Sequence, residues 1–133
     1  MRLFKQKEKE MKDIKLRFWN TDYKNPIMEY GSIRDLDKMY RAQDKNIMLS
    51  TGLQDVAGKD IYEGDIVDIG KVMERFCIIE FKNAKFSLKF LDDFEKGSPT
   101  DIDFFIDRIK IVGNIYETPE LIEQSLGGVT NTI

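Results

Sequence analysis

The chain has 133 residues, of which 41% are hydrophobic and 34% are charged, and its formal net charge is −3. This size and composition are typical of one soluble globular domain, or of a small barrel with an appended subdomain, and the negative charge argues against an open basic face for duplex nucleic acid. The chain has no histidine and a single cysteine, Cys77, which excludes internal disulfides, cysteine-built zinc sites and catalysis that depends on a histidine base.

Residues 1–10 are mostly charged, and we expect them to form a flexible N-terminal extension. They lack the apolar core of a signal peptide, and the apolar runs elsewhere are only a few residues long. We therefore predict a cytoplasmic protein without a membrane partner. One of the apolar runs, residues 76–79, contains Cys77, so we expect that thiol to be buried and unreactive.

Residues 14–19 alternate strictly between two faces, which predicts a β-strand. A loop over 20–26 and a second strand over 27–30 complete a predicted hairpin. One face of the first strand is apolar, with Ile14, Leu16 and Phe18.

The opposite face of this strand carries Lys15, Arg17 and Trp19, and Tyr23 lies in the loop that follows. Cations and aromatic rings together form contact surfaces for a base or an acidic partner. Alternatively, Trp19 packs against the appended subdomain and the two cations are solvated, an interpretation that the usual burial of large aromatic side chains favours. We keep Lys15, Arg17, Trp19 and Tyr23 as the candidate interaction surface.

Residues Ser32 to Asp35 resemble a capping box, and the apolar residues that follow at helical spacing predict a helix to about Gln43. Asn46 ends this helix. Residues 47–49 are predicted to form a short strand.

The stretch from 50 to 70 contains two turns and the strand between them. Asp55 and Gly58 occupy the first and fourth positions of a predicted type I turn. Gly64 interrupts an apolar strand, so we expect a sharp bend or a positive φ at this residue. The pattern predicts a β-hairpin followed by a bent strand, as at the corner of a small barrel.

Three further strands are predicted over 74–81, 85–91 and 106–116, and Lys82-Asn83-Ala84 forms a tight hairpin between the first two. The strands between 46 and 117 are expected to close an antiparallel barrel. Its predicted core contains Ile61, Ile66, Val67, Ile78, Phe81, Phe86, Leu88, Ile109 and Ile111.

A polar loop is predicted over 92–103, and a short helix is predicted to start at Thr118, with Pro119 in its first position. The loop lacks the alternating oxygen ligands and terminal glutamate of a calcium site, so we expect a solvated loop without a metal. Its acidic residues are Asp92, Asp93, Glu95, Asp101 and Asp103.

Several runs of this sequence are similar to those of one protein family. They are Met11–Trp19 (MKDIKLRFW), Thr51-Gly52-Leu53, Gly58-Lys59, Ile61–Val67 (IYEGDIV), Val112–Glu117 (VGNIYE) and Pro119-Glu120-Leu121. In these runs the chain resembles the YopX family, small proteins encoded mainly by phages and prophages. Ala57 and Asp60 depart from the family's common Asn and Glu, but both residues keep the turn. The resemblance implies a mostly β domain with an SH3-type barrel, and no established biochemical activity.

We therefore predict a mainly β fold: a small antiparallel SH3-like barrel with an N-terminal β-hairpin and short-helix subdomain and a short C-terminal helix. The expected parts are an extension (1–10), the N-terminal subdomain (11–45), the barrel with its C-terminal helix (46–126) and a flexible tail (127–133).

No phosphate-binding loop, dinucleotide fingerprint or nucleophile elbow is present, and we predict neither a cofactor nor an enzymatic activity. The leading hypothesis is a phage- or prophage-encoded accessory protein that binds a host or phage macromolecule in the cytoplasm of the bacterial host. A protein partner is favoured, and self-association is left open. The alternatives are a single-stranded nucleic-acid-binding module and an enzyme of unrecognised type, since distant strands could still bring two carboxylates together.

Overall fold

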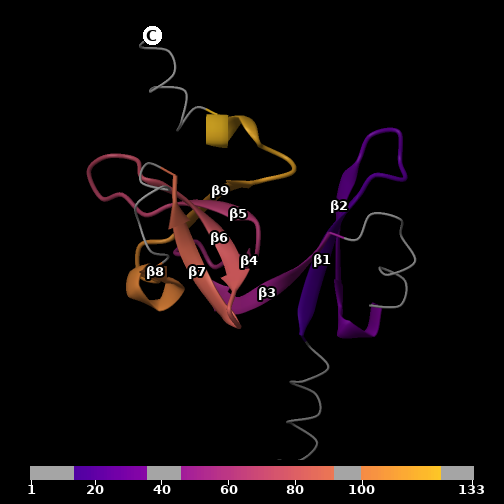
Figure 1. Cartoon of the computed structure of the whole chain (residues 1–133), viewed down its shortest axis with the longest axis horizontal. Coiled ribbons are helices and arrows are strands. Elements are labelled where there is room, and N and C mark those ends of the chain that lie inside the picture. The colour runs from indigo at the N-terminus through magenta and orange to yellow at the C-terminus, as the bar shows by residue number, and fades with distance from the viewer. Residues whose placement is uncertain (1–13, 36–45, 92–99, 124–133) are drawn as a thin grey trace, which may run out of the picture. The chain divides into compact units, whose positions relative to one another are not determined.

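The computed structural model describes residues 14–35, 46–91 and 100–123, and it is mainly β, as predicted (Figure 1). The chain divides into two compact units, residues 1–52 (the N-terminal unit) and 53–133 (the C-terminal unit). Two antiparallel sheets have the strand orders β2-β1-β3-β4 and β8-β7-β6-β5-β9. The strands are β1 (Lys15–Asn20), β2 (Ile27–Ser32), β3 (Ile47–Gln54), β4 (Asp60–Tyr62), β5 (Asp65–Asp68), β6 (Phe76–Lys82), β7 (Lys85–Phe90), β8 (Thr100–Asp101) and β9 (Lys110–Asn114), with 3-10 turns η1 (Ile33–Asp35) and η2 (Ile102–Phe105).

In the N-terminal unit, β1 is the central strand between β2 and β3, which confirms the predicted first hairpin. It pairs antiparallel with β2 along its whole length and with β3 over Leu16, Arg17 and Phe18. Leu16 and Phe18 are buried, and Ile47 and Leu49 of β3 pack against them. The predicted apolar face of the first strand is therefore confirmed for Leu16 and Phe18, whereas Ile14 lies before β1 and is 42% exposed.

The predicted capping box is present, and it starts the 3-10 turn η1. The Ser32 backbone amide donates to Asp35 Oδ2 at 2.9 Å, and the Arg34 amide donates to Ser32 Oγ at 3.3 Å. Several predictions lie outside the described residues: the extension over 1–10, the helix beyond Asp35, most of the acidic loop, and the tail.

The core of the C-terminal unit is formed by side chains from β4, β5, β6, β7 and η2, together with the residue after β5 and the residue before β9. Cys77 belongs to this core and is fully buried, as predicted. The buried cluster contains Ile61, Val67, Ile69, Cys77, Ile79, Leu88, Ile102 and Ile109.

The predicted barrel core is confirmed for five residues and wrong for two. Ile61, Ile66, Val67, Leu88 and Ile109 are buried. Phe86 and Ile111 are partly buried and pack against the cluster.

The two errors lie on β6, where the alternation places Cys77 and Ile79 inward rather than Ile78. Phe81 is at the hairpin end of the strand, where the core no longer covers it, and 41% of its surface is exposed. It stacks instead on Phe86, with the ring centroids 4.7 Å apart.

The three predicted turns all form. Gly58 donates its amide to the Asp55 carbonyl at 3.0 Å and has a φ of +83°. Gly64, between β4 and β5, has a φ of +86°. Asn83 and Ala84 form the two-residue turn between β6 and β7 with φ values of 55° and 61°, which is the conformation of a type I′ hairpin turn.

The strand predicted over 106–116 is shorter in the structure. Residues 102–105 form η2, and the Arg108 amide donates to the Phe105 carbonyl, so β9 begins only at Lys110. Thr118 precedes a helical turn over 120–123, as predicted. Its hydroxyl, however, bonds the backbone of Asn114, accepting from the amide at 2.9 Å and donating to the carbonyl at 3.1 Å.

Candidate functional site

A pocket of about 350 Å³ opens in the C-terminal unit between the β5–β6 loop (residues 69–75) and the turn that follows η2. Phe105, the last residue of η2, and Arg108 of the following turn line one side, and the loop supplies Ile69, Gly70, Lys71, Met73, Glu74 and Arg75. We call this the basic pocket, because three of its lining residues are cations and one, Glu74, is an anion.

The β5–β6 loop is closed at its base by Asp68. Its Oδ1 accepts from the backbone amides of Gly70 and Arg75, each at 2.9 Å, and the Ile69 amide donates to the Arg75 carbonyl at 3.0 Å. A Cβ on Gly70 would lie 1.6 Å from the Met73 carbonyl oxygen, so the loop closes this tightly only with glycine there. The backbone that carries the pocket residues is therefore fixed by local hydrogen bonds.

Each arginine of the pocket makes a cation–π contact with a phenylalanine ring. The guanidinium carbon of Arg75 lies 4.2 Å from the centroid of the Phe90 ring, and that of Arg108 lies 4.8 Å from the centroid of Phe105. The two rings meet edge to face, with centroids 6.3 Å apart, and both pack against the buried core. Cation–π contacts of this kind contribute about 0.5–1 kcal/mol each at exposed sites. The positions of both charges are thus set by core-anchored rings.

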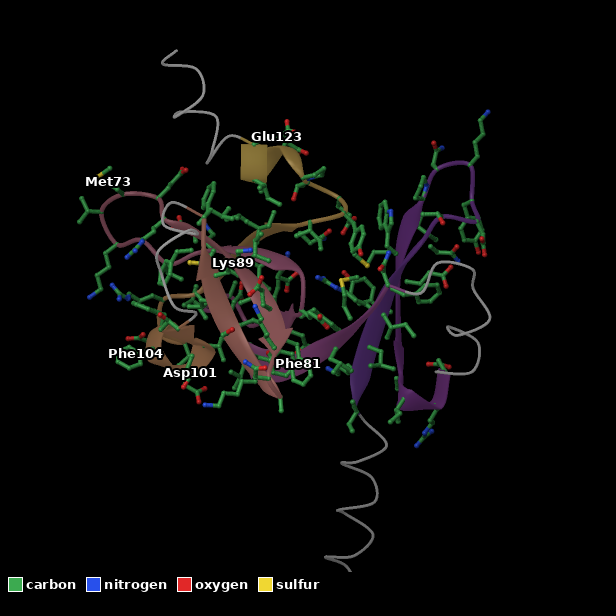
Figure 2. The ribbon with its side chains drawn as sticks, in the orientation of Figure 1. Met73, Phe81, Lys89, Asp101, Phe104 and Glu123 are labelled. Atoms are coloured by element: carbon green, nitrogen blue, oxygen red, sulfur yellow. The ribbon has the colours of Figure 1, made fainter. Side chains whose placement is uncertain are left out.

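Large apolar side chains are exposed on the same two segments. Val72 is 97% exposed, Met73 is 79% exposed, and Phe104 of η2 is 78% exposed. Figure 2 shows Met73 on its loop and Phe104 on η2, both with their side chains directed outward. A basic pocket beside exposed apolar side chains can bind a ligand that has both anionic and apolar groups.

All four residues of the predicted interaction surface lie in the N-terminal unit. The residues of the basic pocket belong to the C-terminal unit and come later in the sequence. Lys15 is exposed, Trp19 is partly buried, and Tyr23 is 53% exposed in the loop between β1 and β2. Arg17 is only 2% exposed, so the expectation that it faces solvent is wrong. The interaction surface as a whole stays a prediction.

Arg17 is buried because both faces of β1 are covered at this point of the strand. Successive residues of a strand point to opposite faces, and Leu16, Arg17 and Phe18 are all buried. Both faces of β1 are therefore covered over these residues. Alternation in the sequence assigns the faces, but it does not say that one of them is open to water.

Two buried acidic residues, Asp55 and Asp65, accept hydrogen bonds from backbone amides. Asp55 is buried, its Oδ1 accepts from the amides of Ala57 and Lys59 at 2.9 Å each, and its Oδ2 accepts from the Ile111 amide at 3.0 Å. Burial raises the pKa of Asp55, but these backbone hydrogen bonds and the Lys59 charge outweigh it and hold the pKa below its usual value. Asp65 is also buried and accepts from the Tyr62 amide at 2.7 Å.

Asn114 organises the turn after β9 in a similar way. Its Oδ1 accepts from the amides of Tyr116 and Glu117 at 3.0 and 2.8 Å, and its Nδ2 donates to Glu117 Oε1 at 2.7 Å. The turn approaches the strand so closely that a Cβ on Gly113 would lie 1.9 Å from Thr118 Oγ1. The Val112–Glu117 run thus encodes a turn.

Within 14–35, 46–91 and 100–123, no group of three or more Cys, Asp or Glu residues is arranged to hold a metal ion. None of the helices in these ranges has the length and apolar character needed to cross a membrane.

The basic pocket was not predicted from the sequence. The available local signal was the apolar pair Val72-Met73, which lies in a polar loop two residues after Gly70. Arg75 and Arg108 come from distant parts of the chain, and only the folded sheet brings them to one pocket.

Comparison with solved structures finds similarity to the crystal structure of protein EF1440 from Enterococcus faecalis. The sequence identity is 24%, the alignment covers 85% of this chain and 77% of that chain, and the TM-score is 0.46. No curated protein matches the sequence.

The model of a protein family described as YopX protein matches residues 1–123. This match includes the Asp55 turn, the Gly64 turn and the Asn114 turn, whose residues serve the backbone as described above. Because it spans nearly the whole chain, the protein belongs to the YopX family.

Proposed function

We propose that this protein acts by binding a macromolecular partner through the basic pocket and the exposed side chains of Val72 and Met73. The main support for this proposal is that Val72 and Met73 are 97% and 79% exposed on a loop whose base is closed by hydrogen bonds to Asp68. The two neighbouring side chains present apolar surface to water and add nothing to the core. On folded proteins, contiguous exposed apolar surface marks interaction sites.

The chemistry of the buried carboxylates supports binding rather than catalysis. Asp55 and Asp65 accept backbone hydrogen bonds, and the lowered pKa of Asp55 makes it a poor general base near neutral pH. The chain contains no histidine that could replace them. A binding role needs none of these groups to react.

We further propose the finer features that the family resemblance suggests. Residues 46–126 would form an SH3-type barrel with a C-terminal helix, and residues 11–45 would form a separate subdomain. The protein would be a phage- or prophage-encoded accessory factor in the cytoplasm of the host. The antiparallel order β8-β7-β6-β5-β9 and the bend at Gly64 support the barrel.

The test is affinity purification of the tagged full chain from bacterial cells that carry its gene, with and without nuclease. Wild type is compared with Val72→Ser and Val72→Ser/Met73→Ser. The matched control is Val56→Ser, which removes an exposed valine of the same unit in the hairpin turn. We expect the same partner to be captured by wild type and by Val56→Ser, and to be lost with the loop variants while their circular dichroism and melting temperature are unchanged.

Equal capture by all variants would contradict the proposed binding surface. Loss of the partner on nuclease treatment would identify nucleic acid as the bound macromolecule. Recovery of a second, differently tagged copy as the main partner would show that the surface serves self-association.

A further inference from the structure

We infer that the partner of the basic pocket is an acidic peptide segment in which an apolar side chain stands next to the carboxylates. This inference rests on the proposed binding function and adds the chemical class of the ligand. It is drawn from the charges, the arginine geometry and the apolar residues of the pocket.

The charge of the pocket is opposite to that of the chain. Lys71, Arg75 and Arg108 line it together with one anion, Glu74, although the whole protein has a net charge of −3. Charges of one sign gathered in a pocket raise the local concentration of ligands of the other sign and steer their approach. The complementary ligand is therefore an anion.

The geometry of Arg108 favours a carboxylate. Its guanidinium carbon lies 4.8 Å from the centroid of the Phe105 ring, and a cation–π contact leaves the N–H groups of a guanidinium available to an anion. Planar, oriented N–H groups match the two oxygens of a carboxylate in a bidentate pair. The Phe105 ring packs against the core and therefore fixes the position of the Arg108 charge before the ligand arrives.

The apolar residues favour a peptide over a free anion. Met73 lines the pocket and is largely exposed, and Val72 beside it is almost fully exposed. An apolar ligand side chain placed next to a carboxylate would cover these residues, and methionine adapts its shape to such contacts. An inorganic anion would leave them in water.

The same observations favour a peptide over single-stranded nucleic acid. Single-stranded nucleic acid stacks successive bases on several ring faces, whereas here the Phe105 ring already holds Arg108 and, among the described residues of the β5–β6 loop and η2, Phe104 alone presents an exposed ring. The exposed side chains of the loop, Val72 and Met73, are not aromatic. The net charge of −3 also opposes the approach of a long polyanion.

The test uses fluorescence anisotropy with the full chain and a labelled octapeptide, Gly-Asp-Glu-Leu-Asp-Glu-Ser-Gly. The comparison probes are its Asn/Gln amide analogue, an analogue with Ser in place of Leu, and an eight-nucleotide oligothymidylate. We expect the acidic probe to bind best, with an affinity that falls by about tenfold for the amide analogue, as for the loss of a charge-assisted hydrogen bond. The affinity should also fall for the serine analogue and on raising the salt concentration.

The protein variants place this binding in the pocket. Arg108→Gln should weaken the acidic probe by about tenfold, and Arg108→Lys should weaken it less, because it keeps the charge and loses the planar group. Arg34→Gln removes an exposed arginine of the N-terminal unit and should leave the affinity unchanged. If Arg108→Gln does not fold, Lys71→Gln is compared with Lys82→Gln, an exposed lysine at the end of β6.

Equal binding of the acidic and amide probes, or unchanged affinity of the folded pocket variants, would overturn the inference. Tighter binding of the oligothymidylate would overturn it in favour of nucleic acid. If the loop variants lose their cellular partner while the acidic probe fails to bind, the proposed function stands and the acidic-peptide inference falls. If the partner is retained by the loop variants, the proposed function itself falls.

Discussion

Asp55 Oδ2 accepts a hydrogen bond from the backbone amide of Ile111 at 3.0 Å, across 56 positions of the sequence. The same carboxylate holds the turn of the β3–β4 hairpin through the amides of Ala57 and Lys59. In addition, the Val56 amide donates to the Ile109 carbonyl at 3.0 Å. One buried side chain thus joins a local turn to β9, the edge strand of the five-stranded sheet.

Replacing Asp55 should therefore destabilise the protein strongly. Asp55→Ala leaves three backbone amides without their acceptor, two of them in the turn and one on β9, and we expect a loss of about 3 kcal/mol in the free energy of unfolding. Asp55→Asn keeps one acceptor oxygen and should lose less. Denaturant unfolding measures both, with Asp103→Asn, an exposed carboxylate of the same unit, as the control. An Asp55→Ala protein as stable as wild type would show that the bonds contribute nothing.

The hydrogen bonds that Asp55 accepts also predict how acid changes the stability of the protein. The pKa of Asp55 is lower in the folded protein than its ordinary value of 3.8, so the folded state favours the ionised form. This stabilisation is present above the unfolded pKa and is lost as the pH falls through the folded pKa. The difference in unfolding free energy between wild type and Asp55→Asn should therefore be constant above about pH 5 and shrink as the pH falls through the ordinary value of 3.8 and below it. A difference that does not shrink on this acidification would contradict the assignment.

Local turn chemistry is the part of the fold that the sequence predicts best. The turns at Asp55–Gly58, at Gly64 and at Asn83-Ala84 all form, because each depends on a few residues whose backbone preferences act over a short span. The run Phe76–Ile79 shows the limit of such reasoning. It has no polar residue to mark a face, and its orientation is set by pairing with β7, where Ile79 lies opposite Leu88.

The turn η2 could have been predicted, but the basic pocket could not. Ile102, Phe105, Ile106 and Ile109 have helical spacing, and all four belong to the core or pack against it. The pocket depends instead on Arg75 and Arg108, which are distant in the sequence and line the same pocket only in the folded protein. Their phenylalanine partners, Phe90 and Phe105, likewise come from different elements.

The β6–β7 turn offers a stabilising substitution. Ala84 has a φ of +61°, where a Cβ is strained and glycine is not. We expect Ala84→Gly to raise the free energy of unfolding by about 1 kcal/mol, because type I′ turns favour Asn-Gly. The effect is measured by thermal and denaturant unfolding. A lower melting temperature would mean that the added freedom of the unfolded chain outweighs the relief of strain.

Substitution of Gly64, in contrast to Ala84→Gly, should lower the free energy of unfolding. Gly64 has a φ of +86°, and its amide and carbonyl bond Ile79 and Ile115, so the backbone has little freedom to change. Gly64→Val places a β-branched side chain in this conformation and should cost more than about 1 kcal/mol. Val112→Ala on β9 serves as a comparison that changes a partly buried side chain without a positive φ. An unchanged melting temperature for Gly64→Val would contradict the requirement for glycine.

The two candidate surfaces can be separated by mutating each in turn. Val72→Ser/Met73→Ser removes the apolar part of the C-terminal site, and Lys15→Gln/Tyr23→Ser removes the exposed part of the N-terminal one; Arg17 is left unchanged because its burial makes a folding defect the expected result. If the partner binds at the basic pocket, titration of the purified partner should show at least a tenfold weaker affinity for the first variant and an unchanged affinity for the second. Such a contrast follows from hot-spot energetics, since a few side chains at the centre of an interface carry most of its binding energy. The reverse result would place the interaction on the strand and loop of the N-terminal unit.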